Sequence, residues 1–573
     1  MSTLSALLAD LVYLYGEKNG RTSFARVERL IEQYRSPVSN QATTELSQRD
    51  TILITYGDQV QQQDESPLHT LAQFCSKYLP GLVSSLHILP FYPFSSDDGF
   101  SVIDYRRVDP RLGSWEEIKE LGQNFKLMFD AVINHISAQS DWFQGFLEGE
   151  TRFQDYFIVI TGNPDLSKVV RPRILPLLTH FTTSSGEESL WTTFSEDQID
   201  LNYHNPEVLL EMLDLLLFYA QQGAEFIRLD AIAYLWKEIG SACIHLPQTH
   251  AVIRIMRALL QQAAPQVRLI TETNVPHVEN MSYFGDGKNE AHLIYNFALP
   301  PLELYTLQKG DAEPLSTWAS GLKLPSQQVT FFNFLASHDG IGVAPLRGIL
   351  PERAIDELAR RTRELGGYVS YRSNPDGSQS PYELNINYFD ALANPAVEES
   401  LEIQIERFCA AHAIQLALVG VPGIYFHSLF GSRGWLEGVR LSGRNRSINR
   451  QKLSLAELEF DLNIPSSLRS QVFGRLSRLL RARASHAAFQ PFGEQCVIDC
   501  GTQVFCVIRG GSKTTGQVLC LQNVSAQAVM VNLPTEITFQ YSAAMDLISG
   551  EKLMIKHGSN LRLEPYQTLW LAF

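Results

Sequence analysis

Cysteine is scarce and scattered in this chain of 573 residues. Seven cysteines occur, an odd number, and no two of them form a C-x-x-C pair. A structural zinc site or a disulfide framework needs closer and more regular spacing. Reduced thiols in a cytoplasmic protein are the simpler interpretation. The cysteines are Cys75, Cys243, Cys409, Cys496, Cys500, Cys506 and Cys520.

An excess of positive charge and long apolar runs are also lacking. The 47 Lys and Arg residues against 62 Asp and Glu give a net charge of −15, whereas nucleic-acid binding normally needs a basic face. No segment reaches the roughly 18 uncharged apolar residues of a membrane span. Near the N-terminus Asp10 interrupts the apolar stretch and no basic segment precedes it, which predicts a helix rather than a signal peptide. We therefore expect a cytoplasmic protein without nucleic-acid or membrane partners.

Eight short apolar runs alternate along the chain with amphipathic, helical segments. Short apolar runs bounded by polar loops are typical of strands buried on both faces of a parallel sheet. Eight of them over about 400 residues predict an α/β fold, a (β/α)8 TIM barrel. An open doubly wound sheet is the alternative, but no G-x-G-x-x-G follows the first run. The runs are Thr51–Thr55, Leu86–Phe91, Leu127–His135, Phe226–Ala231, Leu269–Asn274, Ile294–Pro300, Phe331–Asp339 and Val421–Phe426.

Two long connections and a change of pattern divide the chain further. About 90 residues separate the third and fourth runs, too many for an ordinary loop, and the turn-rich Ser373–Ser380 lies in a second long connection after the seventh run. From about Gln490 the apolar residues alternate with period two, which predicts an antiparallel β-sandwich. The predicted units are an N-terminal helical extension (1–50), a catalytic barrel (51–489) with insertions at 136–222 (domain B) and 340–400 (domain B′), and a C-terminal β domain (490–573).

Acidic residues lie within or at the end of four of the predicted strands: Asp130, Asp230, Glu272 and Asp339. The ends of barrel strands converge on one pocket, so these residues are expected to share a site. Three acids there fit glycoside chemistry, which uses a nucleophile, a general acid/base and a carboxylate that holds sugar hydroxyls. The alternative is that each acid merely caps the following helix.

The neighbours of these acids favour the catalytic interpretation. Arg228 and Asp230 are two residues apart, so on a strand they point to the same side, and the arginine would keep a nucleophilic carboxylate ionised. Glu272 has few basic neighbours in sequence, which predicts the raised pKa that a general acid needs. His135 and His338 stand beside strand-end positions and could donate to sugar hydroxyls.

These motifs resemble those of the α-amylase superfamily of retaining glycoside enzymes, from about residue 50 to the C-terminus. The resemblance implies Asp230 as nucleophile, Glu272 as general acid/base and Asp339 as transition-state stabiliser. IDLN (Ile199–Asn202) resembles an additional motif in domain B. The four barrel motifs are DAVINH (Asp130–His135), IRLDA (Ile227–Ala231), the glutamate of TETN (Glu272) and ASHD (Ala336–Asp339).

Within that superfamily the chain is similar to the sucrose phosphorylase subfamily, through Leu89–Tyr105, Arg228–Gly240, Ser337–Gly342 and Gly443–Arg450. The resemblance implies Tyr234 in the acceptor subsite and Phe100 as an aromatic platform under the sugar, although Phe100 could also be an ordinary core residue. The implied glucose subsite is Asp97, Phe100, His135, Arg228, His338 and Arg446.

The chain departs from sucrose phosphorylases in the loop after the seventh strand. Those enzymes carry Asp-Leu-Tyr-Gln where this chain has Ser380–Glu383 (SPYE); Tyr382 is retained, but the fructose contacts are changed. The chain looks most like glucosylglycerate phosphorylases. This resemblance is carried by the sequence around this loop and by two segments nearer the N-terminus, Arg171–Phe181 and Leu190–Leu210. That resemblance implies phosphorolysis of 2-O-α-D-glucosyl-D-glycerate to α-D-glucose 1-phosphate and D-glycerate.

An anionic acceptor needs a cation, and arginine can bind carboxylate or phosphate through two hydrogen bonds. Arg173, then Arg171, are the candidates, because both lie in domain B; they could instead be structural arginines paired with acids. No metal or other cofactor is expected beyond inorganic phosphate as co-substrate. A sucrose or sucrose 6′-phosphate phosphorylase, an α-glucosidase and a non-catalytic binding barrel remain as alternatives.

Overall fold

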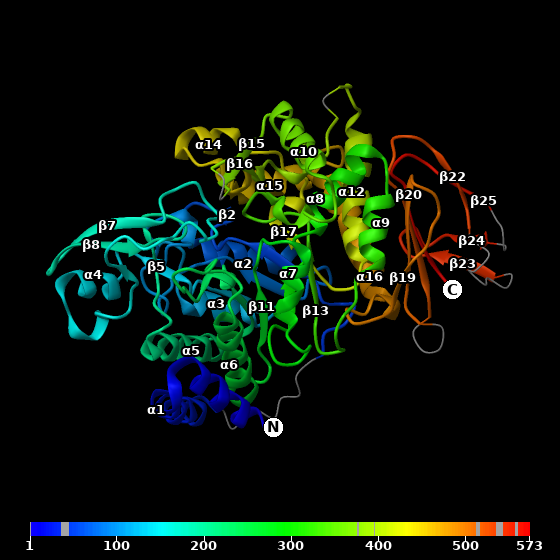
Figure 1. Cartoon of the computed structure of the whole chain (residues 1–573). Helices are drawn as coiled ribbons and strands as arrows, with labels where there is room; N and C mark the ends of the chain where they lie inside the picture. Colours follow the sequence, from blue (N-terminus) through cyan, green and yellow to red (C-terminus); the bar gives the residue numbers. More distant parts are fainter. Residues whose placement is uncertain are drawn as a thin grey trace.

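Eight parallel strands form a closed barrel at the centre of the chain (Figure 1). The computed structural model describes residues 2–35, 45–374, 377–394, 396–511, 516–533, 542–555 and 560–573. Each strand coincides with one of the eight predicted apolar runs, so the predicted barrel is confirmed. The barrel strands are β1 (Ile52–Thr55), β3 (Ser85–Ile88), β4 (Lys126–Ala131), β10 (Ala224–Leu229), β11 (Arg268–Thr271), β12 (Leu293–Tyr295), β13 (Thr330–Phe334) and β17 (Val421–Tyr425).

Helices cover the outside of this barrel, and local sequence sets where several of them begin. The Ser66 side chain accepts from the His69 amide at the start of α2, and Ser114 and Glu117 form a capping box at α3. Proline occupies the first turn of α2, α5, α6 and α8, where its missing N–H costs nothing. These helices are α2 (Pro67–Tyr78), α3 (Trp115–Gly122), α5 (Pro206–Gln221), α6 (Pro247–Ala263), α7 (His277–Met281), α8 (Leu299–Lys309), α9 (Glu313–Ser320), α12 (Leu401–Ala417), α13 (Phe426–Leu429), α15 (Leu455–Leu462) and α16 (Leu468–Ser485).

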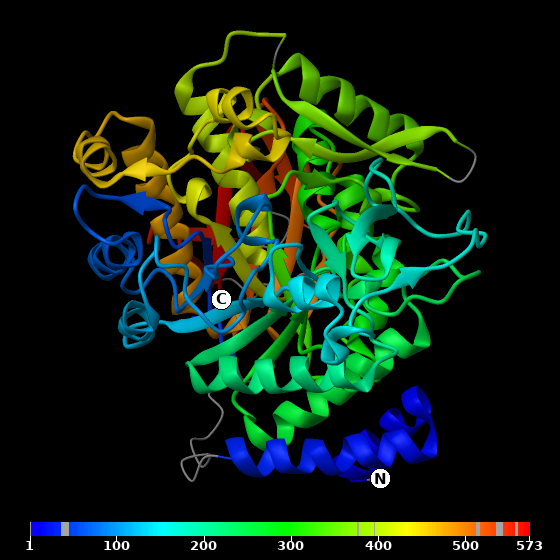
Figure 2. The same ribbon diagram turned by 90° about the vertical axis from the view of Figure 1, so that its left-hand side faces the viewer.

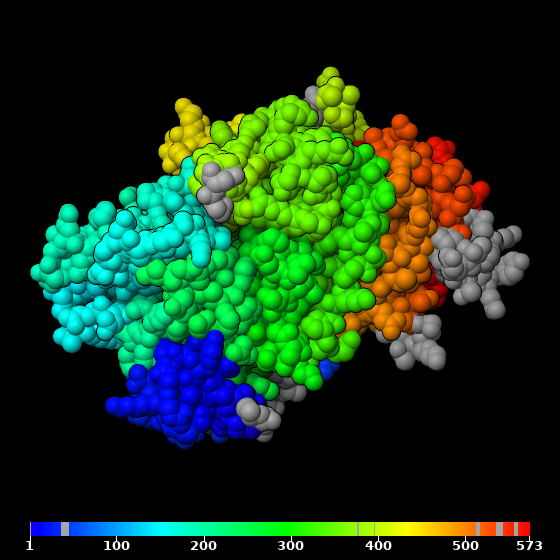
Figure 3. All heavy atoms as spheres, in the orientation of Figure 1, coloured from blue at the N-terminus to red at the C-terminus, as the bar shows by residue number. Residues whose placement is uncertain are grey.

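The connection after β4 forms a small unit that projects from one side of the barrel, cyan in Figure 3. Its strands build a two-stranded pairing, β5 with β9, and a three-stranded antiparallel sheet, β6-β8-β7. The end of the predicted 136–222 insertion is α5, which instead packs on the barrel strand β10. The elements are β5 (His135–Ser137), α4 (Asp141–Glu148), β6 (Val159–Ile160), β7 (Leu178–Thr183), β8 (Gly186–Trp191) and β9 (Gln198–Asp200).

A second excursion after β13 places a β-hairpin over the same end of the barrel as the first (Figure 2). The three strands pair in the order β14-β16-β15, and β16 carries Tyr382 and Glu383. The predicted loop Ser373–Ser380 begins at the last residue of β15 and ends in β16, and its residues 375 and 376 lie outside the described part. The elements are β14 (Ile341–Gly342), α10 (Glu352–Glu364), β15 (Tyr368–Ser373), β16 (Gln379–Asn385), α11 (Tyr388–Ala391), and, after β17, α14 (Leu436–Ser442).

The C-terminal part is built from antiparallel sheets on the side opposite the first insertion (Figure 3). The buried Arg509 joins it to the barrel, since its guanidinium donates to the carbonyls of Ala417 and Gln490, each at 2.8 Å. Six strands form one sheet and two form another: β19 (Gln495–Val497), β20 (Val504–Arg509), β21 (Val518–Asn523), β26 (Thr568–Ala572), β23 (Ser542–Asp546) and β24 (Lys552–Ile555), then β22 (Val529–Asn532) with β25 (Asn560–Leu563).

One long helix, α1 (Thr3–Tyr34), precedes the barrel and lies across α5 and α6 (Figure 2). Asp10 pairs with Arg254 of α6 at 2.6 Å, and the Tyr15 hydroxyl donates to the Tyr203 carbonyl. The backbone turns at Gly16, which adopts φ 76, a conformation that glycine reaches without strain. Residues 36–44 of the predicted extension lie outside the described part.

Candidate active site

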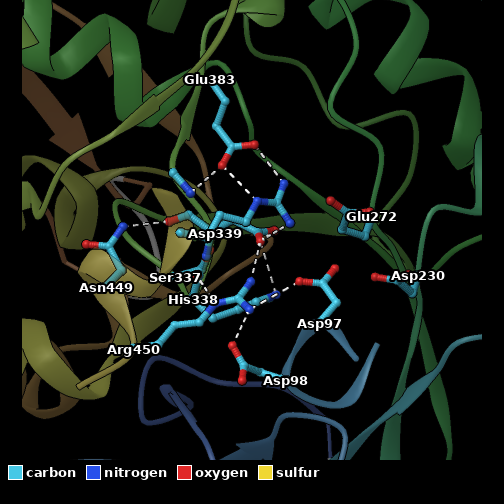
Figure 4. Close-up of polar contacts among 12 residues, drawn as sticks. Asp97, Asp98, Asp230, Glu272, Ser337, His338, Asp339, Glu383, Asn449 and Arg450 are labelled. Atoms are coloured by element: carbon cyan, nitrogen blue, oxygen red, sulfur yellow. Dashed lines mark hydrogen bonds and ion pairs between the residues drawn. The ribbon is translucent and has the colours of Figure 1, made fainter. Parts of the chain in front are cut away.

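The three predicted catalytic acids line one pocket at the C-terminal end of the barrel. Asp230 follows β10, Glu272 follows β11, and Asp339 stands in the loop after β13. Figure 4 shows Asp230 and Glu272 next to each other, on one side of Asp339. All the other predicted binding residues line the same pocket except Arg228 and Arg171.

Arg228 lies beneath the pocket rather than in its lining, and it binds both acids. Its Nη1 donates to Asp230 at 2.7 Å, and its Nη2 is 3.8 Å from Glu272. Arg228 also donates a hydrogen bond to Asp130, whose other carboxylate oxygen lies 2.6 Å from His87. Because one guanidinium contacts both Asp230 and Glu272, the two carboxyl groups are close together, the arrangement that retaining glycoside chemistry uses.

Burial sets the protonation of these acids. It raises the pKa of Glu272 to about 7, against the opposing charge of Arg228. The sequence predicted this direction for a different reason, a lack of basic neighbours, which is wrong because Arg228 lies 3.8 Å away. Burial also raises the pKa of Asp230, and Arg228 again opposes the shift. A carboxyl group with a pKa near 7 can both give and take a proton at neutral pH.

Asp339 is held by a charged network that the second insertion completes. Arg446 lies 2.5 Å from Asp339 and donates two hydrogen bonds to Glu383, at 2.9 and 2.7 Å. Glu383 is 1% exposed and also accepts from the Gly340 amide at 2.8 Å. In the sequence Glu383 stands out only as a departure from the sucrose phosphorylase pattern, which does not place it in the site.

Arg450 is a second residue of the site that the sequence analysis missed, although it ends the motif that contains Arg446. It donates to Asp97 at 3.2 Å and to Asp98 at 2.6 Å, and lies 3.5 Å from Asp339 (Figure 4). Burial would raise the pKa of Asp97, but Arg450, Arg446 and Arg173 together lower it to about 2. Asp97 is therefore ionised and can accept hydrogen bonds from sugar hydroxyls.

Phe100 and His338 form a stacked pair in the pocket, with ring centroids 4.6 Å apart and planes 5° from parallel. Burial, together with the charges of Arg450 and its neighbours, lowers the pKa of His338 well below its usual value, so its ring is neutral. His135 lies 2.9 Å from the Phe100 carbonyl, which orients its ring. The platform expected of Phe100 is thus braced from one side by a histidine.

Tyr234, Tyr382 and Arg173 also line this pocket, close enough to influence one another's charges. The charge of Arg173 acts on the pKa of both tyrosines, which burial raises. In the described part of the chain, Arg173 makes no hydrogen bond or ion pair with another residue. Arg171 lies outside the pocket, where its guanidinium donates to the Leu175 carbonyl. Of the two predicted cations, Arg173 is the one available to a ligand.

The described ranges contain neither a cluster of potential metal-ligating side chains nor a helix suited to cross a membrane. Among those residues no three His, Cys, Asp or Glu side chains are grouped so that they could hold a metal ion. None of the helices described there is both long and apolar enough to pass through a bilayer.

An eight-stranded barrel that gathers three carboxylic acids at its C-terminal end is an arrangement suited to retaining glycoside chemistry. The family "Alpha amylase, catalytic domain" matches residues 76–343.

The chain is 47% identical to a glucosylglycerate phosphorylase of Spirochaeta thermophila, over 98% of this chain and 97% of the relative. It is 46% identical to one of Allomeiothermus silvanus, over 99% and 98%. The chain belongs to the glucosylglycerate phosphorylase family.

Among solved structures, the sucrose 6F-phosphate phosphorylase of Thermoanaerobacter thermosaccharolyticum superposes with a TM-score of 0.74 at 26% identity. The match covers 90% of this chain and all of that structure. The barrel and its attachments are therefore shared with a phosphorylase.

Proposed function

We propose that this protein cleaves 2-O-α-D-glucosyl-D-glycerate with inorganic phosphate, giving α-D-glucose 1-phosphate and D-glycerate with retention of configuration. The similarity to glucosylglycerate phosphorylases over nearly the whole chain carries this proposal. Arg173, which lines the pocket and pairs with no other described residue, supports it, because both glycerate and phosphate are anions that arginine binds well.

In the first step Asp230 attacks the anomeric carbon and the bond to the glycerate oxygen breaks. Glu272 gives its proton to that oxygen, which its pKa of about 7 permits near neutral pH. Arg228 stabilises the Asp230 carboxylate through the 2.7 Å hydrogen bond. Asp339 and Asp97 hold sugar hydroxyls, and positive charge that develops on the ring is stabilised by the surrounding carboxylates.

In the second step a phosphate oxygen attacks the anomeric carbon of the β-glucosyl enzyme and displaces Asp230. The proton of the phosphate passes to Glu272, which restores the starting state. Tyr382 and Arg173 line the pocket, and in this proposal glycerate leaves and phosphate enters beside them. We propose that the segment carrying Tyr382 rearranges between the two steps. Cytoplasmic location and the absence of any cofactor other than phosphate are part of the same proposal.

Product assays test this function against its alternatives. The wild-type enzyme is incubated with glucosylglycerate, sucrose or sucrose 6′-phosphate, with and without inorganic phosphate, and glucose 1-phosphate is measured. We expect phosphate-dependent turnover of glucosylglycerate. Glucose formation independent of phosphate would instead establish an α-glucosidase. Turnover of the sucrose substrates alone would show that the acceptor is fructose or fructose 6-phosphate rather than glycerate. Absence of turnover on every donor would favour the non-catalytic barrel.

A further inference from the structure

One side chain in the pocket has no role in the mechanism above. Asn274 lines the pocket two residues after Glu272. Its carboxamide forms no hydrogen bond with any residue of the described ranges, and its Oδ1 is fully buried. Leaving this buried oxygen without a hydrogen-bond donor is costly. Asn274 as a whole is only partly buried, and Nδ2 is not one of its fully buried atoms, so Nδ2 is the atom that a ligand in the pocket can reach.

The backbone of the second insertion holds this amide in place. A side chain on Gly342 would put its Cβ 2.5 Å from both Nδ2 and Oδ1 of Asn274, so the carboxamide occupies space that only a glycine leaves open. The backbone of Gly342 is not in the left-handed region, and its lack of a side chain is explained by this contact rather than by its conformation.

The same strand places Asn274 on the acceptor side of the pocket. Gly342 is paired with Glu383 in the β14–β16 ladder, and the next residue, Val343, donates its amide to the Tyr382 carbonyl. Asn274 therefore lies beside the segment of Tyr382, which the charge of Arg173 also reaches. The glucose side of the pocket, at Asp97 and Phe100, is held by other elements.

We propose that Asn274 determines acceptor specificity by donating a hydrogen bond from Nδ2 to the carboxylate of the glycerate unit. This inference rests on the proposed function. An amide donor suits an oxyanion, and it adds to Arg173 a contact that is neutral and fixed in position. The alcohol analogue, in which a CH2OH group replaces the carboxylate, would gain less from this donor.

Two donors that differ only in that group test the proposal. We would measure kcat/KM for phosphorolysis of glucosylglycerate and of the neutral glucosylglycerol, with Asn274→Ala and Asn274→Asp in the full-length enzyme. The ratio of the two values cancels any effect on the catalytic acids. We expect the preference for glucosylglycerate to fall about ten-fold or more in Asn274→Ala, and further in Asn274→Asp, where a carboxylate would repel the substrate.

Gly342→Ala provides an independent variant, because its added methyl group must displace the Asn274 amide while Asn274 itself is retained. It should lower the same ratio. Asp97→Asn is the matched control: it changes an acid to an amide on the glucose side and should lower both kcat/KM values with little change in their ratio. Thermal unfolding of each variant verifies that it is folded.

The outcomes separate this inference from the proposed function. Ratios within two-fold of wild type in both Asn274 variants would overturn the role of Asn274 while leaving phosphorolysis of glucosylglycerate intact. Failure of the wild-type enzyme to use either donor would overturn the proposed function itself. A lower ratio in Asn274→Ala and Gly342→Ala, but not in Asp97→Asn, is the result that we expect.

Discussion

Glu383 accepts two hydrogen bonds from Arg446, at 2.9 and 2.7 Å, and Arg446 in turn lies 2.5 Å from Asp339. A residue of the second insertion thus orients the arginine that faces Asp339, one of the three predicted catalytic acids. Since Glu383 is buried, its negative charge is a large part of what balances Arg446. The insertion therefore contributes a side chain to the charged network around Asp339, in addition to lying over the end of the barrel.

Replacing Glu383 with Gln should weaken catalysis with little change in shape. The amide can accept only one hydrogen bond from the guanidinium in the same way, and Arg446 is then left to Asp339. Hydrogen bonds to charged groups contribute about 1.5–3 kcal/mol, so kcat/KM should fall about ten- to one-hundred-fold. Steady-state kinetics of phosphorolysis measure the effect.

Glu399→Gln is the matched control for this experiment, because Glu399 is also a largely buried partner of an arginine, Arg407, but does not line the pocket. It should lower the unfolding temperature and leave kcat/KM within about two-fold of wild type. Equal losses of activity in the two variants would mean that Glu383 acts only through stability.

The pH dependence of the first step should follow Glu272. Its pKa is raised to about 7, and it must carry a proton to protonate the leaving glycerate. Activity should therefore be high below pH 7 and decline ten-fold per pH unit well above it. The measurement is kcat/KM for glucosylglycerate between about pH 5.5 and 9, a range that extends about 1.5–2 units to either side of that pKa. Phosphate reacts only in the second step, so its own ionisation does not contribute to this kcat/KM.

Glu272→Gln should remove this decline together with most of the activity, a loss of about 10²–10⁴-fold. A flat profile up to pH 9 in the wild-type enzyme would contradict the assignment of Glu272 as the proton donor.

Arg173 and Arg171 provide a comparison within one loop. Arg173 lines the pocket without a partner in the described ranges, whereas Arg171 donates to a carbonyl outside it. Arg173→Gln should raise the KM for glucosylglycerate and for phosphate by about ten-fold or more, since a charge-assisted hydrogen bond is lost. Arg171→Gln should change either KM by less than about two-fold. A larger rise in KM for Arg171→Gln than for Arg173→Gln would instead assign the acceptor subsite to Arg171.

The strand ends and their acids could be predicted from sequence because each motif is local. Asp230 and Glu272 lie near the ends of two apolar runs, and parallel strands bring such positions together whatever lies between them. Contacts between distant segments could not be predicted in this way. Glu383 meets Arg446 only because the hairpin folds over the barrel, and the two residues are 63 positions apart.

The sequence also could not predict which side chains of a loop point into the pocket. Arg171 and Arg173 are two residues apart, and only the three-dimensional course of the first insertion shows which guanidinium enters the pocket. His87 is a different case, because a histidine inside a buried apolar strand was a visible signal. Its partner, Asp130, stands in the next strand of the barrel.

A last prediction concerns stability and a carboxyl group far from these motifs. Glu303 on α8 is fully buried, and neither of its carboxyl oxygens has a hydrogen-bond partner in the described part of the chain. Burial raises the pKa of Glu303 well above its usual value. The folded protein therefore keeps this proton at pH values where the unfolded chain has lost it, so Glu303 costs stability increasingly as pH rises above about 4.3.

Glu303→Gln removes this ionisation while keeping the shape of the side chain. The variant should be more stable than wild type at pH 8, by about 1–3 kcal/mol, and the difference should shrink toward pH 5. Urea unfolding at several pH values measures it, with Glu364→Gln, an exposed partner of Arg360 on α10, as the control that should show no such trend. A difference between Glu303→Gln and wild type that does not vary with pH would show that the carboxyl group is not held in its protonated form.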